Sequence, residues 1–310
     1  MNYKQLAATE QKFAGGHRSC AGCGFPMIIR AVLASSKDPI VVGSATGCLE
    51  VTSTIYPFTS WKVPFIHNAF ENAAATMSGV ETAYNVFKKK GKISEKINFV
   101  AFGGDGGTYD IGLQSLSGAL ERGHNFLYVL YDNEAYMNTG IQRSSATPTG
   151  ASTTTDPAGK VRQGKQENRK DIAKIAVAHN IPYVAQASLS NLIDLTKKAE
   201  KAFSIDGPKF MVVLQPCTLG WNYPPAKTVE MATLAVESCF WPLYEVENGV
   251  YKLSYKPKNK IPVVDFFKPQ GRFKHLFKPG NEEFLQRLQD DVDKAWNNLL
   301  KLCGETCVRI

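Results

Sequence analysis

The sequence predicts an α/β protein built around a doubly wound, mainly parallel sheet. Short continuous apolar runs, of which 98–102 and 126–131 are the clearest, are typical of strands that are buried on both faces. Between these runs, apolar residues recur at helical spacing over 111–120. The same alternation of helix and strand extends over residues 25–214, which is the pattern of a layered α/β domain.

The other elements follow in chain order from the same signals. Pro26 suits the first turn of a helix, where its missing N–H is not needed, and Ser188 is a suitable helix cap. The expected strands are 39–42, a proline-interrupted strand within 55–66, 98–102, 126–131, 182–185 and 208–214. The expected helices are 26–35, 73–88, 111–122, 170–179, 188–202, one from about residue 228, and 282–302.

The chain changes character after Gly220. Residues 251–280 are rich in lysine, proline and aromatic residues and have no apolar period. We therefore expect residues 1–225 to form one α/β domain, and residues 226–310 to form an extension that packs on the domain or on partner subunits. The long loop at 144–164, rich in Ser, Thr, Pro and Gly, either closes over a site, meets a partner or is a surface excursion.

Charge and hydropathy exclude several classes of function. The chain has 36 Lys and Arg against 28 Asp and Glu, a net charge of +8, and its charges are spread rather than clustered. Such a surplus suits solubility or an acidic protein partner, whereas nucleic-acid binding favours clustered basic residues with interleaved aromatics. No apolar run approaches membrane-spanning length, and residues 1–5 lack a signal-peptide core. We expect a cytoplasmic protein that binds neither nucleic acid nor membrane.

Polar residues follow two neighbouring strands where each strand ends. Asp105 lies within the glycine cluster 103–107, and Asn133 follows the next strand. Open parallel sheets bind ligands beyond the carboxyl ends of their strands. A carboxylate, an amide oxygen and a nearby backbone carbonyl suit Mg²⁺ that also holds a phosphate, and glycines let backbone N–H groups approach that phosphate. The unit therefore predicts a magnesium–diphosphate site.

Two other phosphate-binding motifs fail on residue type. A Walker loop needs Lys and then Ser or Thr after its last glycine, where Thr108 and Tyr109 follow Gly107 instead. A dinucleotide fingerprint needs glycine three residues after Gly106, which is again the position of Tyr109. An ordinary glycine-rich turn with an unrelated Asp-Asn loop is the remaining alternative, and the matching strand ends make it less favourable.

Seven cysteines, an odd number, favour metal or redox chemistry over a disulfide framework. Cys20 and Cys23 form a Cys-x-x-Cys turn, which suits a redox pair, half of a zinc site or two inert thiols. Together with Cys48 and Cys217, which each follow an apolar strand, they could instead surround an iron–sulfur cluster. Spacing alone leaves a cluster and scattered buried thiols equally open. The other three cysteines, Cys239, Cys303 and Cys307, lie in helical or tail segments, and we expect Cys303 and Cys307 to pack or to remain free.

Two motifs resemble a known family. Gly104-Asp105-Gly106 with Asn133 downstream resembles the thiamine diphosphate motif. Residues 131–142, YDNEAYMNTGIQ, resemble the β subunit of the 2-oxoacid:ferredoxin oxidoreductases of the pyruvate type, and residues 241–245 are similar to the same branch. The resemblance covers most of 15–220 and implies the thiamine diphosphate-binding fold.

The resemblance also implies site residues. Mg²⁺ on the cofactor diphosphate would be held by Asp105, Asn133 and the Ala135 carbonyl, and Asn138 would lie near the thiazolium and the substrate as a catalytic residue. The implied cofactor-binding set is Gly104, Asp105, Gly106, Asn133 and Ala135. The implied ligands of a proximal [4Fe–4S] cluster are Cys20, Cys23, Cys48 and Cys217.

The implied reaction is the oxidative decarboxylation of a 2-oxoacid, here pyruvate, with coenzyme A to acyl-CoA and CO₂, with electrons passing through the cluster to ferredoxin. The family's activating glutamate comes from a pyrimidine-binding α subunit, and neither Glu50 nor Glu71 of this chain matches it. Separately, His67 at a strand–helix junction is a candidate for either a structural or a catalytic role. Activity would require that subunit and the γ and ferredoxin-like δ subunits. The alternatives are a relative acting on branched-chain 2-oxoacids or oxalate, a non-redox thiamine diphosphate enzyme subunit, and a scaffold protein with a zinc knot.

Overall fold

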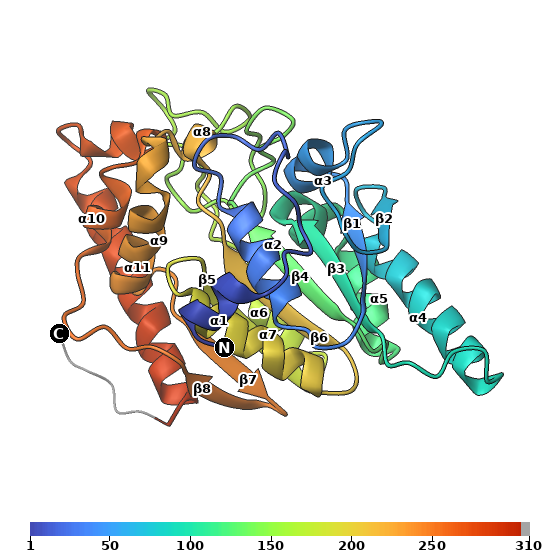
Figure 1. The fold of residues 1–310 in the computed structure, drawn as a ribbon. Coiled ribbons are helices and arrows are strands. Elements are labelled where there is room, and N and C mark those ends of the chain that lie inside the picture. The colour runs from blue at the N-terminus through green and yellow to red at the C-terminus, as the bar shows by residue number, and fades with distance from the viewer. Residues whose placement is uncertain (305–310) are drawn as a thin grey trace.

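The computed structural model describes residues 1–304, which fold around an eight-stranded sheet (Figure 1). The strands are β1 (Ile40–Ala45), β2 (Phe65–Asn68), β3 (Asn98–Gly104), β4 (Leu127–Asp132), β5 (Tyr183–Ser188), β6 (Lys209–Leu214), β7 (Tyr244–Glu247) and β8 (Val250–Leu253). Their order is β2-β1-β3-β4-β6-β5-β7-β8. Strands β1 to β6 pair in parallel, and β7 and β8 add an antiparallel edge. The predicted doubly wound, mainly parallel sheet is confirmed.

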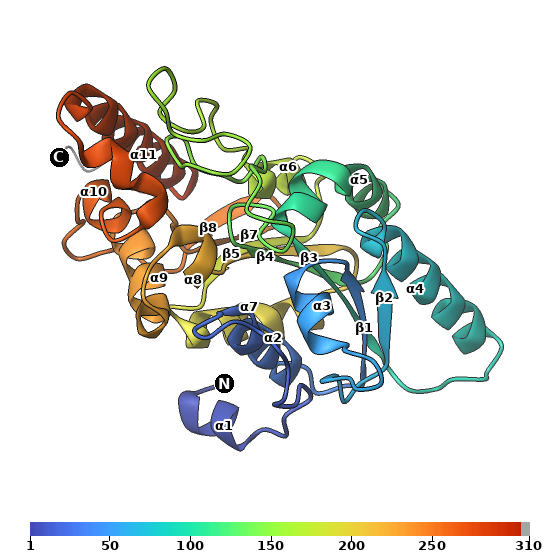
Figure 2. The same ribbon diagram turned by 90° about the horizontal axis from the view of Figure 1, so that it is seen from above.

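Helices cover both faces of the sheet, as the view from above shows (Figure 2). The α-helices are α1 (Tyr3–Ala8), α2 (Phe25–Ala34), α3 (Cys48–Ser53), α4 (Ala73–Lys89), α5 (Leu113–Glu121), α6 (Ile172–Val177), α7 (Leu192–Ser204), α8 (Thr218–Trp221), α9 (Thr228–Glu237), α10 (Val263–Phe267) and α11 (Glu282–Leu302). On one face α2 packs against α7, and on the other α4 packs against α5. A π-helix over Gly106–Ile111 leads from the end of β3 into α5.

The two faces have separate hydrophobic layers. Val100 and its neighbour Ala101 on β3 are both fully buried but belong to different layers, because successive side chains of a strand point to opposite faces. Ala101 packs in the layer of Met77 from α4, and Val100 packs in the layer of Leu195 from α7. Continuous apolar strands are therefore required here, as the sequence predicts.

Two local predictions are wrong. The strand expected within 55–66 forms only at its end, as β2, because proline supplies no N–H to a sheet ladder and Pro64 immediately precedes the strand. Ser188 does not cap a helix, since it is the last residue of β5. Asn191 caps α7 instead, where its side-chain oxygen accepts a hydrogen bond from the Asp194 N–H at 3.0 Å.

The C-terminal segment completes the sheet with a hairpin that the sequence analysis missed. Strands β7 and β8 are joined at Asn248-Gly249, both with positive φ (48° and 81°), and Asn-Gly is the strongest local signal for such a turn. β7 pairs with β5, and α11 residues lie in the same hydrophobic layer as the sheet. The division of the chain at residue 225 stays a prediction, and Cys307 lies outside the described residues.

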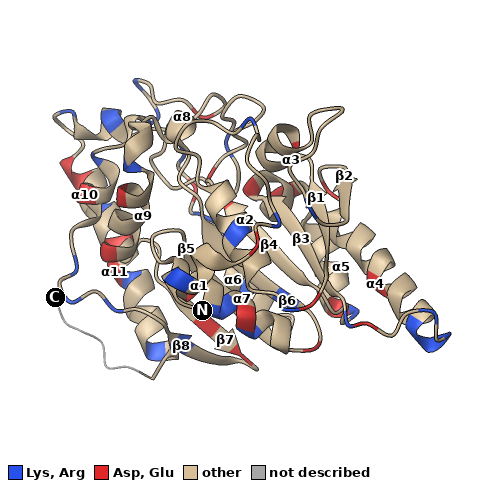
Figure 3. Ribbon diagram, in the orientation of Figure 1, with Lys and Arg blue, Asp and Glu red and all other residues tan. Residues whose placement is uncertain are grey.

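Charges are distributed over the molecule rather than gathered in a stripe (Figure 3). Basic residues concentrate most visibly at the end of α4, where Lys88 and Lys89 lie in the last turn. Within residues 1–304, no helix has both the length and the apolar character that crossing a bilayer requires.

The packing of α11 on the sheet gives a first prediction. Leu300 is fully buried in the shared layer, whereas Leu302, two residues later, is 48% exposed. Replacing Leu300 by Ala should lower the free energy of unfolding by about 2–5 kcal/mol, because a buried cavity is created. Denaturant unfolding measures the change, with Leu302→Ala as the matched control. Equal, small effects in both variants would contradict the shared core.

Candidate functional site

The register of two parallel strands places the predicted polar residues side by side. Gly104 at the end of β3 pairs with Tyr131 near the end of β4, so the next residues of both strands emerge at one edge of the sheet. A cavity of about 120 Å³ lies at this edge. Its lining includes Gly104, Asp105, Gly106, Asn133, Ala135 and Asn138. The structure therefore brings the predicted cofactor residues together.

Three oxygen atoms converge in this cavity. The Asn133 side-chain oxygen lies 2.8 Å from Asp105 Oδ1 and 2.8 Å from the Ala135 carbonyl oxygen. On its other side, the Asn133 amide nitrogen donates to Gln215 Oε1 at 3.2 Å. In this orientation no donor of Asn133 faces the other two oxygens, so that either a cation or a turn of the Asn133 amide by 180° would satisfy the three acceptors. The donor set is the hard oxygen set that Mg²⁺ prefers, so the residues fit a divalent cation.

Asp105 is the charged member of this set, and it is 1% exposed. Burial raises the pKa of its carboxyl well above its ordinary value, and the neighbouring Asp132 carboxylate raises the pKa further. Ser144, from the long loop after β4, donates to Asp105 Oδ2 at 2.5 Å and opposes these effects. The first residue of the loop therefore contacts the site, and the alternatives for the rest of the loop stay predictions.

Gly106 is required here by a close approach. A Cβ at Gly106 would lie 2.4 Å from the ring of Tyr136, whose hydroxyl donates to the Gly106 carbonyl at 3.3 Å and to Asp110 Oδ2 at 3.1 Å. The π-helix that begins at this residue is thus packed directly under the loop that carries Asn133. Only glycine allows that contact.

A buried charge network holds the loop after β4, and sequence reasoning missed it. Glu134 has a positive φ of 70°, and its side chain is fully buried. Arg169 Nη1 donates to Glu134 Oε1 at 2.7 Å, and Arg272 Nη2 donates to Oε2 at 2.6 Å. Arg169 also pairs with Asp132, which accepts from the Tyr109 hydroxyl at 2.6 Å. Two arginines balance two carboxylates, so the network is neutral and paired, as buried charges must be.

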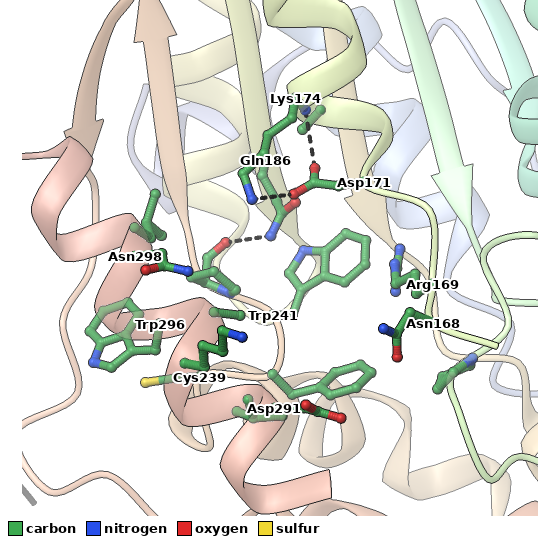
Figure 4. Close-up of a pocket in the computed structure, with 18 of the residues that line it drawn as sticks. Asn168, Arg169, Asp171, Lys174, Gln186, Cys239, Trp241, Asp291, Trp296 and Asn298 are labelled. Atoms are coloured by element: carbon green, nitrogen blue, oxygen red, sulfur yellow. Dashed lines mark hydrogen bonds and ion pairs between the residues drawn. The ribbon is translucent and has the colours of Figure 1, made fainter. Parts of the chain in front are cut away.

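Arg169 also lines a second, larger cavity of about 450 Å³ (Figure 4). Its guanidinium lies 4.5 Å from the ring centroid of Trp241, and Trp296 of α11 lines the same cavity. The lining comes from 168–174, 239–244 and 288–299 among other segments, which are far apart in the sequence. This cavity had no signal in the sequence.

The four predicted cysteines also meet at the sheet edge. Cys20 and Cys23 lie in a tight turn, where the Cys23 N–H donates to the Cys20 carbonyl at 3.0 Å, while Cys48 begins α3 and Cys217 caps α8. Each of the six pairs among them interacts electrostatically. Burial, and to a smaller extent the neighbouring thiols, raises the pKa of the Cys23 and Cys48 thiols to about 12.

Within the described residues, no group of three or more His, Cys, Asp or Glu side chains is arranged to hold a metal ion. These four residue types do not include asparagine or a backbone carbonyl, and Asn133 and the Ala135 carbonyl supply two of the three oxygens described above. One backbone amide and one side-chain amide face the sulfurs. The Gly220 N–H donates to Cys217 Sγ at 3.4 Å, and Gln215 Nε2 donates to Cys23 Sγ at 3.5 Å. The first of these contacts caps the N-terminus of α8.

The remaining predicted residues lie around the mouth of the cavity. Asn138 is exposed and lines it. Buried Glu50 accepts from the Thr54 hydroxyl at 2.8 Å and lies 3.6 Å from His67, which contacts the Thr46 hydroxyl at 2.9 Å. Glu71 is exposed. Away from this edge, Cys239 is buried beside the second cavity, and Cys303 ends α11.

Comparisons with known proteins agree with this geometry. The family model of the C-terminal TPP-binding domain of thiamine pyrophosphate enzymes matches residues 41–213, which contain both strand ends. A solved structure of 2-oxoglutarate:ferredoxin oxidoreductase from Magnetococcus marinus has a similar fold, with a TM-score of 0.56 over 72% of this chain and 79% of that one at 20% identity. The fold and the site define a thiamine diphosphate-binding enzyme domain.

Curated relatives identify the branch. The subunit PorB of pyruvate synthase is 55% identical in Thermotoga maritima, over 97% of this chain and 96% of the relative, and 54% identical in Methanocaldococcus jannaschii, over 92% and 95%. The ketoisovalerate oxidoreductase subunit VorB of Pyrococcus abyssi is 43% identical, over 94% of both chains. The chain belongs to the β subunits of the pyruvate:ferredoxin oxidoreductases, and it is a subunit of a partnered enzyme.

The charge network gives a second prediction. Replacing Arg272 by Met leaves Glu134 with one arginine in a site without solvent, so the free energy of unfolding should fall by about 3–5 kcal/mol. Arg162, which pairs with Asp156 and Glu167 and is half exposed, is the matched control, and Arg162→Met should cost less than about 1 kcal/mol. Thermal or denaturant unfolding compares the two. A cost for Arg272→Met no larger than that of the control would show that the network is dispensable.

Proposed function

We propose that this β subunit takes part in the oxidative decarboxylation of pyruvate with coenzyme A, giving acetyl-CoA and CO₂, and that electrons leave through a [4Fe–4S] cluster to ferredoxin. The observation that carries the proposal is the meeting of two ligand sets at one edge of one sheet. Three oxygens suited to Mg²⁺ and four thiols lie there, and Gln215 contacts both sets.

Asp105, Asn133 and the Ala135 carbonyl would hold Mg²⁺ against the diphosphate of the cofactor. When bound, thiamine diphosphate supplies the carbanion chemistry that breaks the bond between the keto carbon and the carboxyl group of a 2-oxoacid. The chain's own part is to bind and orient. The buried charge network fixes the loop that carries Asn133, and Ser144 holds the Asp105 carboxylate. Asn138 at the open mouth would contact the substrate.

Cys20, Cys23, Cys48 and Cys217 would hold the cluster. Thiolates are the ligands that iron–sulfur clusters use, and cluster binding replaces the protons that burial otherwise retains on Cys23 and Cys48. The cofactor loop and the cysteine loop are in contact, since a Cβ at Gly220 would lie 2.1 Å from Met137 Sδ. Electrons would therefore have a short protein path between the two groups.

The cavity needs partner subunits to become an active site. Asn138 is exposed, and the apolar side chains of Val51 and Leu219 are 44% and 67% exposed close in sequence to Cys48 and Cys217. An α subunit would supply the activating glutamate and cover the cavity, and γ and ferredoxin-like δ subunits would carry the remaining steps. Ferredoxin, coenzyme A and the 2-oxoacid are the other partners, and the enzyme would work in the cytoplasm.

A branched-chain 2-oxoacid is the second candidate substrate, because a relative named ketoisovalerate oxidoreductase subunit is 43% identical to this chain. The relatives named pyruvate synthase subunit are closer, at 54% and 55% identity, and they favour pyruvate. Oxalate and a non-redox thiamine reaction are less favoured.

Separate loss of the two ligand sets gives a third prediction. In protein purified anaerobically, Asp105→Asn should lower bound thiamine diphosphate at least about tenfold and keep its iron, because one charged ligand is lost. Cys217→Ser should lose iron and keep the cofactor. Iron and thiamine analysis with an absorption spectrum measure both, and Cys239→Ser, a buried cysteine outside the set, is the control. Zinc in place of iron would support the scaffold alternative, and thiamine diphosphate without iron the non-redox one.

The need for partners gives a fourth prediction. The isolated chain should show no 2-oxoacid turnover, whereas the complex with its partner subunits should reduce ferredoxin with pyruvate and coenzyme A. The rate for pyruvate should exceed that for 2-oxoisovalerate in kcat/KM. Turnover by the isolated chain would refute the requirement, and the reverse substrate preference would assign the branched-chain activity.

A further inference from the structure

Gln215 lies between the two ligand sets without belonging to either. It follows β6, it is 1% exposed, and its backbone N–H donates to the Asp132 carbonyl at 2.8 Å. Its side-chain oxygen accepts from Asn133, and its side-chain nitrogen faces Cys23. A single buried amide thus contacts one proposed ligand of the cation and one proposed ligand of the cluster.

The orientation of this amide is set by its surroundings. Gln215 Nε2 donates to the Pro216 carbonyl at 3.0 Å and to Cys23 Sγ at 3.5 Å, and both of these partners are acceptors. Nitrogen must therefore face them, and Oε1 must face Asn133, where it accepts from Nδ2 at 3.2 Å.

This orientation in turn decides which way Asn133 points. With its nitrogen engaged by Gln215, Asn133 directs its oxygen at Asp105 and Ala135. In the opposite orientation, Asn133 would donate hydrogen bonds of 2.8 Å to Asp105 Oδ1 and to the Ala135 carbonyl, but its oxygen would then face Gln215 Oε1 at 3.2 Å. That alternative would fill the cation site with the protein's own N–H groups. Gln215 opposes it by repulsion between two oxygens.

The other end of the same amide acts on sulfur. An N–H donor near a thiolate stabilises negative charge on the sulfur, and hydrogen bonds to cluster sulfurs are one of the factors that set a cluster's reduction potential. Since extra negative charge accumulates when a cluster is reduced, the donor favours the reduced form. The Gln215 bond to Cys23 therefore makes the cluster a better electron acceptor.

We propose that Gln215 is a positioning residue that links the two sites: it holds Asn133 open for Mg²⁺ and, through the same amide, raises the reduction potential of the cluster on Cys23. The inference rests on the proposed function, because it requires both groups to bind. Since one amide makes both contacts, loss of the Gln215 side chain would affect the cation site and the cluster together.

Two substitutions separate the two ends of the amide. Gln215→Met keeps a side chain of similar length but removes both the acceptor and the donor. The Mg²⁺ concentration for half-maximal thiamine diphosphate binding should therefore rise about tenfold or more. The reduction potential of the cluster should become more negative. Gln215→Glu keeps an acceptor for Asn133 and loses the donor, so Mg²⁺ binding should stay within about threefold of wild type while the potential still falls. The matched control is Gln186→Met, because Gln186 is likewise a glutamine whose side-chain nitrogen donates to a proline carbonyl, that of Pro242 at 2.9 Å.

The readouts are magnesium-dependent cofactor binding and an anaerobic redox titration followed by electron paramagnetic resonance, both on the assembled complex. Wild-type iron and thiamine contents are measured first, so that failure of the proposed function is seen separately from failure of this inference. If both groups bind and Gln215→Met changes neither Mg²⁺ dependence nor potential, the inference is wrong. It is also wrong if Gln215→Glu and Gln215→Met weaken Mg²⁺ binding equally, since a general loss of packing would then explain both.

Discussion

The Glu134 carboxylate lies between Arg169 and Arg272, and the shape of the cofactor edge depends on that arrangement. Glu134 has a positive φ, which a residue with a side chain rarely adopts, and each of its oxygens is bound by a different arginine. The strain is held by charge pairing in a region from which water is excluded. Because Asn133 and Ala135 flank this residue, the pairing holds the loop backbone from which the Asn133 side chain and the Ala135 carbonyl project.

The same network connects parts of the chain that are far apart in the sequence. Arg272 comes from the C-terminal segment, outside the region matched by the thiamine pyrophosphate domain, and Arg169 comes from the end of the long loop after β4. The guanidinium of Arg272 lies 4.0 Å from the ring centroid of Trp221, and Trp221 Nε1 donates to the Asn133 carbonyl at 2.8 Å. The C-terminal segment thus does more than cover the domain, because it supports the loop that faces the cofactor.

Proximity of the cysteines to the oxygen set has a physical consequence for the proposed reaction. Cofactor and cluster would share buried walls, including Gln215 and the contact of Met137 with Gly220, so electron transfer would not require movement of either loop. Low exposure of Asp105 and Gln215 also keeps water from weakening these interactions. The exposed side of the cavity is where Asn138 lies, and there the partner subunits would complete it.

The sequence by itself determined the β3–α5–β4 unit and the strand ends that carry Asp105 and Asn133, whereas cysteine spacing alone left a cluster and scattered thiols equally open. Apolar periodicity is local, and parallel strands end at a common edge, so these features needed no knowledge of distant contacts. Tertiary structure alone decided that Arg272 would meet Glu134 from 138 residues away, and that the Gln215 side chain would contact Asn133. Local sequence does not reveal which charged or amide side chains will be buried together, because such pairs depend on distance in space rather than on spacing along the chain.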